Sequence, residues 1–283
     1  MSPAELDRQY NPRMTVPDHT DFLLRWARRS AEVRARLQCE TDLRYGVTPA
    51  ETIDVFPAAH VGAPLFAFLH GGYWRALDKS DFSFLAPAFV DAGVTLAVVN
   101  YGLAPAVGIE EIVRQTLRAC AWLWRNAAGL GADPKRLYVG GHSAGGHLTA
   151  MMVAAKWSCY ARDLPDDLFR GGVCISGLYD LTLLAQAPFL REVLNLDESG
   201  ARHVSPVSYR PARNVPLLTA VGALESGEFR RQNSLIARTW PHCPVRDVAM
   251  PGKHHFSIVE ALGDADSALF GETRRFMDGP GLT

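Results

Sequence analysis

Short apolar runs and longer amphipathic runs alternate along most of this chain. From about residue 50 onward, runs typical of buried strands are separated by segments with helical spacing. This alternation predicts an α/β fold with a mostly parallel central sheet and helices on both faces. The expected strands are residues 64–69, 95–99, 136–140, 171–177, 215–224 and 245–250. The expected helices are residues 82–90, 109–128, 147–155, 225–240 and 256–277, with Pro87 kinking or breaking the first of them.

Two segments lie outside this alternation. Residues 1–45 precede the expected sheet and carry large apolar side chains on one helical face. These side chains are Phe22, Trp26, Val33 and Leu37. The stripe predicts a helix docked on the body of the protein, and a lid over a ligand site is the second interpretation. Residues 180–213 are crowded with leucine and predict a small helical cap above the strand ends, within one domain spanning residues 1–283.

Composition and charge exclude several classes of function. Hydrophobic residues make up 48% of the chain, enough to cover both faces of a sheet, and the net charge of −1 gives no basis for binding nucleic acid or an anionic membrane. No apolar run approaches the ~20 residues of a membrane span, and the first residues lack a signal-peptide pattern, so we expect a cytoplasmic protein. The cysteines lack paired spacing and are expected to be reduced thiols. The oligomeric state stays open, with a homodimer as one option.

The strongest chemical signal is the sequence Gly-His-Ser-Ala-Gly at residues 141–145. A strand-like run precedes it and a helix-like run follows it, so the segment predicts a nucleophile elbow. The turn would lift the Ser143 hydroxyl clear of the sheet and leave the N–H of Ala144 free to stabilise an anion. His142, beside the serine, is expected at the substrate pocket and not as the base. The alternative is a glycine-rich helix start capped by Ser143.

A second glycine-rich motif, His-Gly-Gly-Tyr-Trp, follows an earlier strand-like run. Gly71 and Gly72 carry no Cβ, so the backbone can approach a substrate carbonyl closely. We expect the N–H groups of Gly72 and Tyr73 to complete an oxyanion hole with Ala144, and His70 and Gly71 to support the loop. The alternative is an ordinary turn after a strand.

The two aromatic residues of this motif have two interpretations. Tyr73 and Trp74 could line the substrate pocket and stack on an aromatic group of the substrate. They could equally pack in the core beside the loop.

A serine nucleophile needs a base, and the base needs an orienting acid. In this architecture both follow the serine, each after a late strand. Glu225 is the first carboxylate after the strand at 215–224, while Glu228 is expected on the surface of the next helix. His254 and His255 both follow the last strand, and position alone does not choose between them. This chemistry requires no metal or organic cofactor.

These motifs resemble the kynurenine formamidase (arylformamidase) branch of the α/β-hydrolase superfamily, close to hormone-sensitive-lipase-like esterases. The family's His-Gly-Gly-x-Trp motif corresponds to residues 70–74, and its elbow to residues 141–147. The family's His-Phe segment matches residues 255–260, which selects His255 as the base. The segment that begins with the family's triad acid matches residues 225–232, although the acid there is often Asp and here is Glu225.

The resemblance implies an α/β-hydrolase fold and a serine hydrolase with Ser143, Glu225 and His255 as its triad. The implied small-molecule substrate is an aryl amide with a small acyl group, such as N-formylkynurenine, an intermediate of tryptophan catabolism. The first alternative is a short-chain carboxylesterase, because esterases share most of these motifs. The second is a hydrolase-fold binding protein without catalysis, which the presence of both serine and histidine disfavours.

Overall fold

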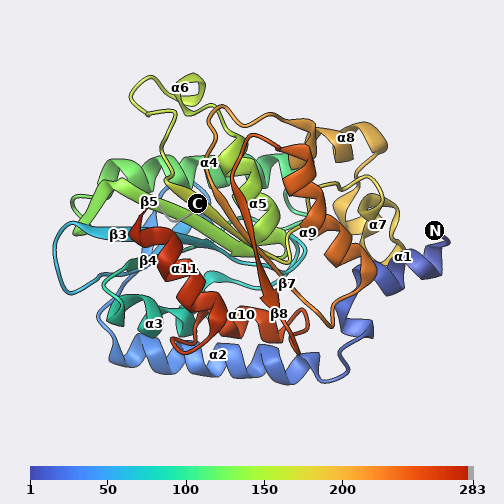
Figure 1. Ribbon diagram of the computed structural model, residues 1–283, viewed down its shortest axis with the longest axis horizontal. Helices are drawn as coiled ribbons and strands as arrows, with labels where there is room; N and C mark the ends of the chain where they lie inside the picture. Colours follow the sequence, from blue (N-terminus) through green and yellow to red (C-terminus); the bar gives the residue numbers. More distant parts are fainter. Residues whose placement is uncertain (280–283) are drawn as a thin grey trace.

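One eight-stranded sheet organises the protein in the computed structural model, which describes residues 1–279 (Figure 1). The strand order is β1-β2-β4-β3-β5-β6-β7-β8, with β2 antiparallel to both of its neighbours and all later pairs parallel. The strands are β1 (Glu40–Arg44), β2 (Thr52–Phe56), β3 (Ala63–Leu69), β4 (Thr95–Val99), β5 (Ala132–His142), β6 (Gly171–Ile175), β7 (Leu217–Gly222) and β8 (Val245–Met250). The predicted α/β class with a mostly parallel sheet is confirmed.

Alternate side chains of each central strand enter two different cores. In β3, Leu65, Ala67 and Leu69 join one apolar cluster, while Phe66 and Phe68 join the other. Helices cover both clusters, as Figure 1 shows. The helices on one face are α4 (Ile109–Asn126), α5 (Ala144–Ala154) and α9 (Gly227–Thr239); those on the other are α2 (His19–Arg36), α3 (Ala86–Asp91), α10 (Ser257–Leu262) and α11 (Ala268–Asp278). Burial of both sheet faces explains the nearly continuous apolar runs of these strands.

Shorter helices and turns complete the fold. The helix α1 lies beside α7 and α9 (Figure 1). The remaining helices are α1 (Pro3–Tyr10), α6 (Trp157–Tyr160), α7 (Pro188–Leu194) and α8 (Glu198–His203), with 3₁₀ turns η1 (Pro12–Met14), η2 (Lys79–Asp81), η3 (Ser83–Leu85), η4 (Leu184–Gln186) and η5 (Pro206–Ser208). The crowded leucines of residues 180–213 therefore lie on short helices and turns.

The structure differs from the sequence-based expectation at several places, among them strand β2, which is not one of the expected strands. Residues 40–44, expected before the sheet, form its edge strand β1, whose mostly exposed side chains give no apolar signal. The single helix expected over 256–277 is divided into α10 and α11, because Gly263 ends the first and the Ser267 side chain caps the second. The helix expected over 82–90 begins as a 3₁₀ turn and becomes α3 at Ala86, so Pro87 stands in the first turn.

The helix α2 docks through the stripe that the sequence predicts. Phe22, Trp26 and Val33 are buried. The Trp26 ring packs 6.1 Å from that of Phe84, and its indole N–H donates to Glu260 Oε1 at 3.1 Å. The helix therefore rests on the body of the protein through an aromatic cluster and a partly buried polar contact.

A buried ion pair ties strands β1 and β2 to the turn after β3. The Lys79 ammonium donates to Asp54 Oδ1 at 2.6 Å and to Asp42 Oδ1 at 2.9 Å. Asp54 is 1% exposed, and its Oδ1 also accepts from the backbone N–H of Asp42 at 2.9 Å. A buried carboxylate of this kind depends on its partners, because it has lost its hydration.

Replacing Lys79 alone should therefore lower the free energy of unfolding more than replacing Lys79 and Asp54 together. We expect Lys79→Met to lower the free energy of unfolding by about 3–5 kcal/mol, because it leaves Asp54 buried and unpaired. Adding Asp54→Asn should restore much of that loss. Urea denaturation of both variants measures the difference, and equal stabilities would contradict an unpaired-charge penalty.

Candidate active site

Parallel pairing brings the carboxyl ends of five strands to one edge of the sheet. Leu69 of β3 pairs with Gly141 of β5, and His142 of β5 pairs with Ile175 of β6. Gly222 of β7 pairs in the same way with Met250 of β8. The ends of these strands and the segments that follow them carry the candidate residues, so the topology gathers them at this edge.

Ser143 stands on a strained turn between β5 and α5. Its φ is 57° and its ψ is −114°, a conformation that residues with a Cβ seldom adopt. Its N–H donates to the carbonyl of Ile175 at 2.8 Å, which fixes the turn against β6. A Cβ on Gly145 would collide with the backbone carbonyl of Leu69, so the elbow requires glycine there.

Glu225 and His255 form a buried pair. His255 Nδ1 donates to Glu225 Oε2 at 2.8 Å, and the two side chains are 5% and 1% exposed. The other carboxylate oxygen accepts from the Ser176 hydroxyl at 2.6 Å and from the N–H of Gly222 at 2.8 Å. Because a carboxylate only accepts, Nδ1 carries the proton and the lone pair of a neutral His255 is on Nε2.

Two rings hold the His255 imidazole in place. The Phe229 ring lies 4.5 Å from it and the His142 ring 4.6 Å, measured between centroids. Burial and the neighbouring His255 hold the pKa of His142 well below its usual value, so His142 is neutral. His254, the other candidate, packs against Phe22 outside this pair.

One small cavity joins the serine to the histidine. Its volume is about 40 Å³, and Ser143, His142, His255, Gly72 and Tyr73 all contribute to its wall. Within residues 1–279, no hydrogen bond joins the Ser143 hydroxyl to the imidazole. Such bonds are often long in ligand-free sites and shorten when substrate binds.

The loop after β3 presents free backbone donors to this cavity. Gly72 has a φ of +109° and Tyr73 a φ of 53°. No backbone or side-chain acceptor in the described chain takes the N–H of either residue. A Cβ on Gly72 would collide with the carbonyl of Ala76, so this loop shape excludes other residues.

His70 is fully buried and contacts the loop after β3. Its Nδ1 lies 2.8 Å from the carbonyl of Gly71, and its Nε2 lies 3.2 Å from Asn100 Oδ1. The Tyr101 ring stacks on it at 4.2 Å, and the Tyr101 hydroxyl donates to its carbonyl at 2.6 Å. Burial lowers the pKa of His70, which keeps the ring neutral.

Of the two interpretations of Trp74, the structure agrees with packing in the core and not with a place in the substrate pocket. It is fully buried, and its indole N–H donates to His147 Nδ1 at 3.3 Å. His147 Nε2 in turn donates to the carbonyl of Val204 at 2.7 Å. The positive φ of Trp74, 57°, directs its ring into the core, so only Tyr73 of the two aromatic residues borders the cavity.

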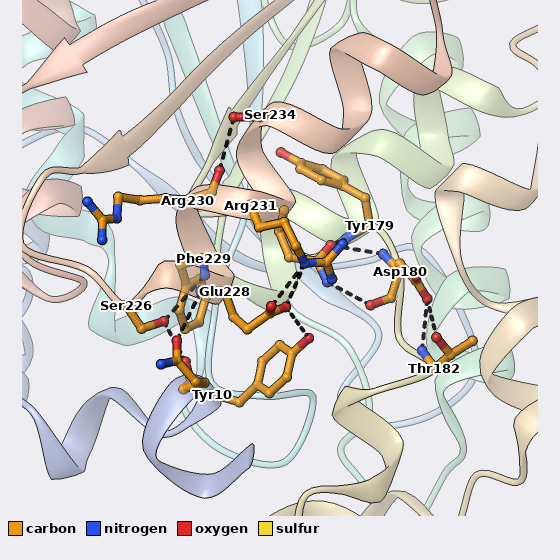
Figure 2. A network of polar contacts seen from close by, with 12 residues as sticks. Tyr10, Tyr179, Asp180, Thr182, Ser226, Glu228, Phe229, Arg230, Arg231 and Ser234 are labelled. Atoms are coloured by element: carbon orange, nitrogen blue, oxygen red, sulfur yellow. Dashed lines mark hydrogen bonds and ion pairs between the residues drawn. The ribbon is translucent and has the colours of Figure 1, made fainter. Parts of the chain in front are cut away.

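The placement of Glu228 on the helix surface is wrong. This residue is 5% exposed, and its carboxylate accepts from the Tyr10 hydroxyl at 2.8 Å and from Arg231 Nε at 2.9 Å (Figure 2). The hydroxyl of Ser226 donates to the carbonyl of Gln9 at 2.5 Å. These bonds fasten the end of α1 to the loop that carries Glu225.

Sequence reasoning missed several residues of this site. Ser176 is a polar residue at the carboxyl end of a parallel strand, and that position is the signal that could have found it. Arg13 of η1 and Arg75 of the loop after β3 also border the cavity. No local pattern marks them, because their place depends on how distant segments pack.

A larger cavity, of about 930 Å³, lies at the opposite edge of the sheet. Residues before β6, β7 and β8 line it, including Arg170, Val215 and Pro244. It is distant from the candidate active site because those strands begin there and end at the edge that carries Ser143.

Among residues 1–279, no group of three or more potential metal ligands occurs. None of the described helices is both long enough and apolar enough to cross a membrane.

The buried His147 should make stability depend on pH. Burial lowers its pKa from 6.5 to about 4, and the hydrogen bond to Val204 offsets part of that effect. Between these two pKa values the imidazole is protonated in the unfolded chain but neutral in the folded protein. The contribution of neutral His147 to the free energy of unfolding is therefore complete above pH 6.5 and is lost as the pH falls towards 4. Between pH 7 and pH 4.5, wild type should lose about 2–3 kcal/mol of unfolding free energy that His147→Gln does not lose. Urea denaturation at both pH values measures this, and a pH-independent difference between the two proteins would refute it.

Comparison with known proteins agrees with this geometry. Residues 66–195 match a family model described as the alpha/beta hydrolase fold. The kynurenine formamidase of Salmo salar is 31% identical, across 95% of this chain and 94% of its own. A carboxylesterase of Mycobacterium tuberculosis, NlhH, is 37% identical but over only 34% of this chain and 30% of its own. The crystal structure of a protein from Silicibacter sp. TM1040, assigned as a thioesterase, superposes with a TM-score of 0.86 at 30% identity, covering 97% of this chain and 99% of its own. The chain belongs to the kynurenine formamidase family of α/β hydrolases.

Proposed function

We propose that the protein is an arylformamidase, a serine hydrolase that removes the formyl group from an aryl formamide of the N-formylkynurenine type. The observation that carries this proposal is the meeting of Ser143, His255 and two free backbone N–H groups around one cavity. Similarity to kynurenine formamidases across nearly the whole chain supports the substrate class.

In the first step, Ser143 Oγ attacks the formyl carbon while His255 Nε2 takes the hydroxyl proton. The Nδ1–H bond to Glu225 fixes the required tautomer and stabilises the imidazolium that forms. The Ser176 hydroxyl and the N–H of Gly222 hold the second oxygen of Glu225, which keeps its first oxygen directed at Nδ1.

The carbonyl oxygen becomes negative as the tetrahedral intermediate forms. We assign its stabilisation to the N–H groups of Gly72, Tyr73 and Ala144, the last at the N-terminus of α5. The imidazolium then gives its proton to the aryl nitrogen, and the C–N bond breaks to release the arylamine. Water, deprotonated by the same imidazole, attacks the formyl ester of Ser143, and formate leaves as the serine regains its proton.

The size of the cavity favours a formyl group over longer acyl groups. The whole cavity, including the side bordered by Arg13 and Arg75, measures about 40 Å³, so the space for an acyl group beside Ser143 is smaller still and the leaving group must extend out of it. The rings of Phe229 and His142 flank the imidazole of His255, so the cavity has little room to expand beside it. A short-chain carboxylesterase is the second candidate, because a carboxylesterase matches part of the chain.

A substrate panel separates these activities. We expect kcat/KM for N-formylkynurenine to exceed that for 4-nitrophenyl acetate, and turnover of 4-nitrophenyl butyrate to be weaker still, because the acyl space is small. Ser143→Ala should lower kcat by about 10⁵-fold or more. Strong ester turnover without deformylation would favour the carboxylesterase, and no labelling of wild type by a fluorophosphonate would favour a binding protein.

The role of the acid is tested by removing its charge while keeping its shape. Glu225→Gln should lower kcat about 10³–10⁴-fold, because an amide supports the wrong tautomer of His255. Ser176→Ala removes one of the three hydrogen bonds to the carboxylate. It should lower kcat roughly tenfold, which corresponds to the energy of about one hydrogen bond. Steady-state kinetics of both variants gives the comparison, and an active Glu225→Gln enzyme would exclude Glu225 as the acid.

A further inference from the structure

Two arginines border the catalytic cavity, and the proposed chemistry uses neither of them. Arg13 comes from η1 in the N-terminal segment, and Arg75 comes from the loop after β3. They share this cavity with Ser143 and His255. Arg13 is exposed and Arg75 half-buried, so they stand where the cavity meets solvent.

The Arg75 side chain is held in position by α7. Its Nη1 donates to the carbonyl of Phe189 at 3.0 Å, and its guanidinium carbon lies 5.7 Å from the centre of the Phe189 ring. Its own N–H donates to the carbonyl of Gly72 at 3.1 Å, within the oxyanion loop. Most of its N–H donors remain available for a ligand.

The N-terminal segment is fixed just as firmly. The Tyr73 hydroxyl donates to the carbonyl of Tyr10, and the Tyr10 hydroxyl donates to Glu228 at 2.8 Å (Figure 2). The Asn11 side chain then accepts from the N–H of Arg13 at 3.2 Å, which shapes the turn η1. Arg13 is therefore presented at the cavity by an anchored turn.

No acidic side chain neutralises these two arginines in the described chain. Neither forms an ion pair with Asp or Glu of residues 1–279. The Glu225 carboxylate is already bound by three donors, and Asp7 accepts from the N–H of Phe189 instead. Burial and the charge of Arg13 lower the pKa of Arg75, which shows that the two cations repel each other.

We propose that Arg13 and Arg75 bind a carboxylate carried by the leaving group of the substrate. Two unneutralised guanidinium groups at the mouth of an otherwise apolar and aromatic cavity suit a planar anion, because guanidinium and carboxylate pair through parallel hydrogen bonds. The inference rests on the proposed function, in which the arylamine extends from the acyl site towards solvent. It makes these arginines specificity-determining residues that favour anionic arylamides over neutral ones.

Paired substrates test this assignment directly. N-formylkynurenine carries the carboxylate, and N-formylkynuramine is the same arylformamide without it. We expect Arg75→Gln and Arg13→Gln each to lower the kcat/KM ratio of the first to the second by roughly 10–100-fold, mainly through KM. Arg75→Lys should recover part of the ratio, and Arg28→Gln, an exposed arginine on α2, should leave it unchanged. An equal loss on both substrates, or no loss on either, would overturn the proposal.

A second pair of substrates separates this proposal from the arylformamidase proposal. In 4-acetoxybenzoate the leaving group carries a carboxylate, whereas in phenyl acetate it carries none. If the protein hydrolyses these esters but no formamide, the arylformamidase proposal fails. A preference for 4-acetoxybenzoate that disappears in the double glutamine variant would still support the arginine site, and no such preference would overturn it. Calorimetry of kynurenine and kynuramine binding to Ser143→Ala makes the same comparison without turnover. Equal Kd values for the two ligands would overturn the proposed arginine site.

Discussion

The candidate site depends on the hydrogen bonds that the buried carboxylate of Glu225 accepts. It lies at the junction of three strand ends, with Ser176 after β6, Gly222 at the end of β7 and His255 after β8. A buried charge without partners would cost several kcal/mol, so the three donors and the register of these strands must form together. The position of the imidazole follows from this, because its orientation is fixed by the carboxylate and by the rings beside it.

Backbone strain concentrates around the same cavity. Of the described non-glycine residues with positive φ, five lie in the loops after β3, β5 and β6. These are Tyr73, Trp74, Leu77, Ser143 and Ser176. Each such residue costs on the order of 1–3 kcal/mol, and the surrounding core must supply that energy. The burial of Trp74 and its bond to His147 illustrate how the core holds the loop after β3 in a shape that leaves the N–H groups of Gly72 and Tyr73 without an acceptor in the described chain.

The N-terminal segment belongs to the site as much as the motifs do. Tyr10 links α1 both to the loop after β3, through Tyr73, and to the helix after Glu225, through Glu228. The turn that follows carries Arg13 to the cavity. Part of the cavity wall thus comes from residues that precede the sheet, and the anchoring of this segment fixes their position.

Sequence pattern predicted those parts of the protein that interactions between residues close in the chain determine. Strand and helix periodicity predicted the α/β class, and glycine spacing predicted the sharp turns at Ser143 and Gly72, because sterics within a few residues decide both. Chain order also limited the acid and the base to a few residues, since parallel strands end at one edge.

Tertiary structure decided what depends on contacts between distant segments. It buried Glu228 against Tyr10, turned Trp74 into the core and left Tyr73 at the cavity. It added the exposed strand β1, whose side chains lack an apolar pattern because only its backbone pairing places it in the sheet. Such outcomes depend on which surfaces meet, and no short stretch of sequence contains that information.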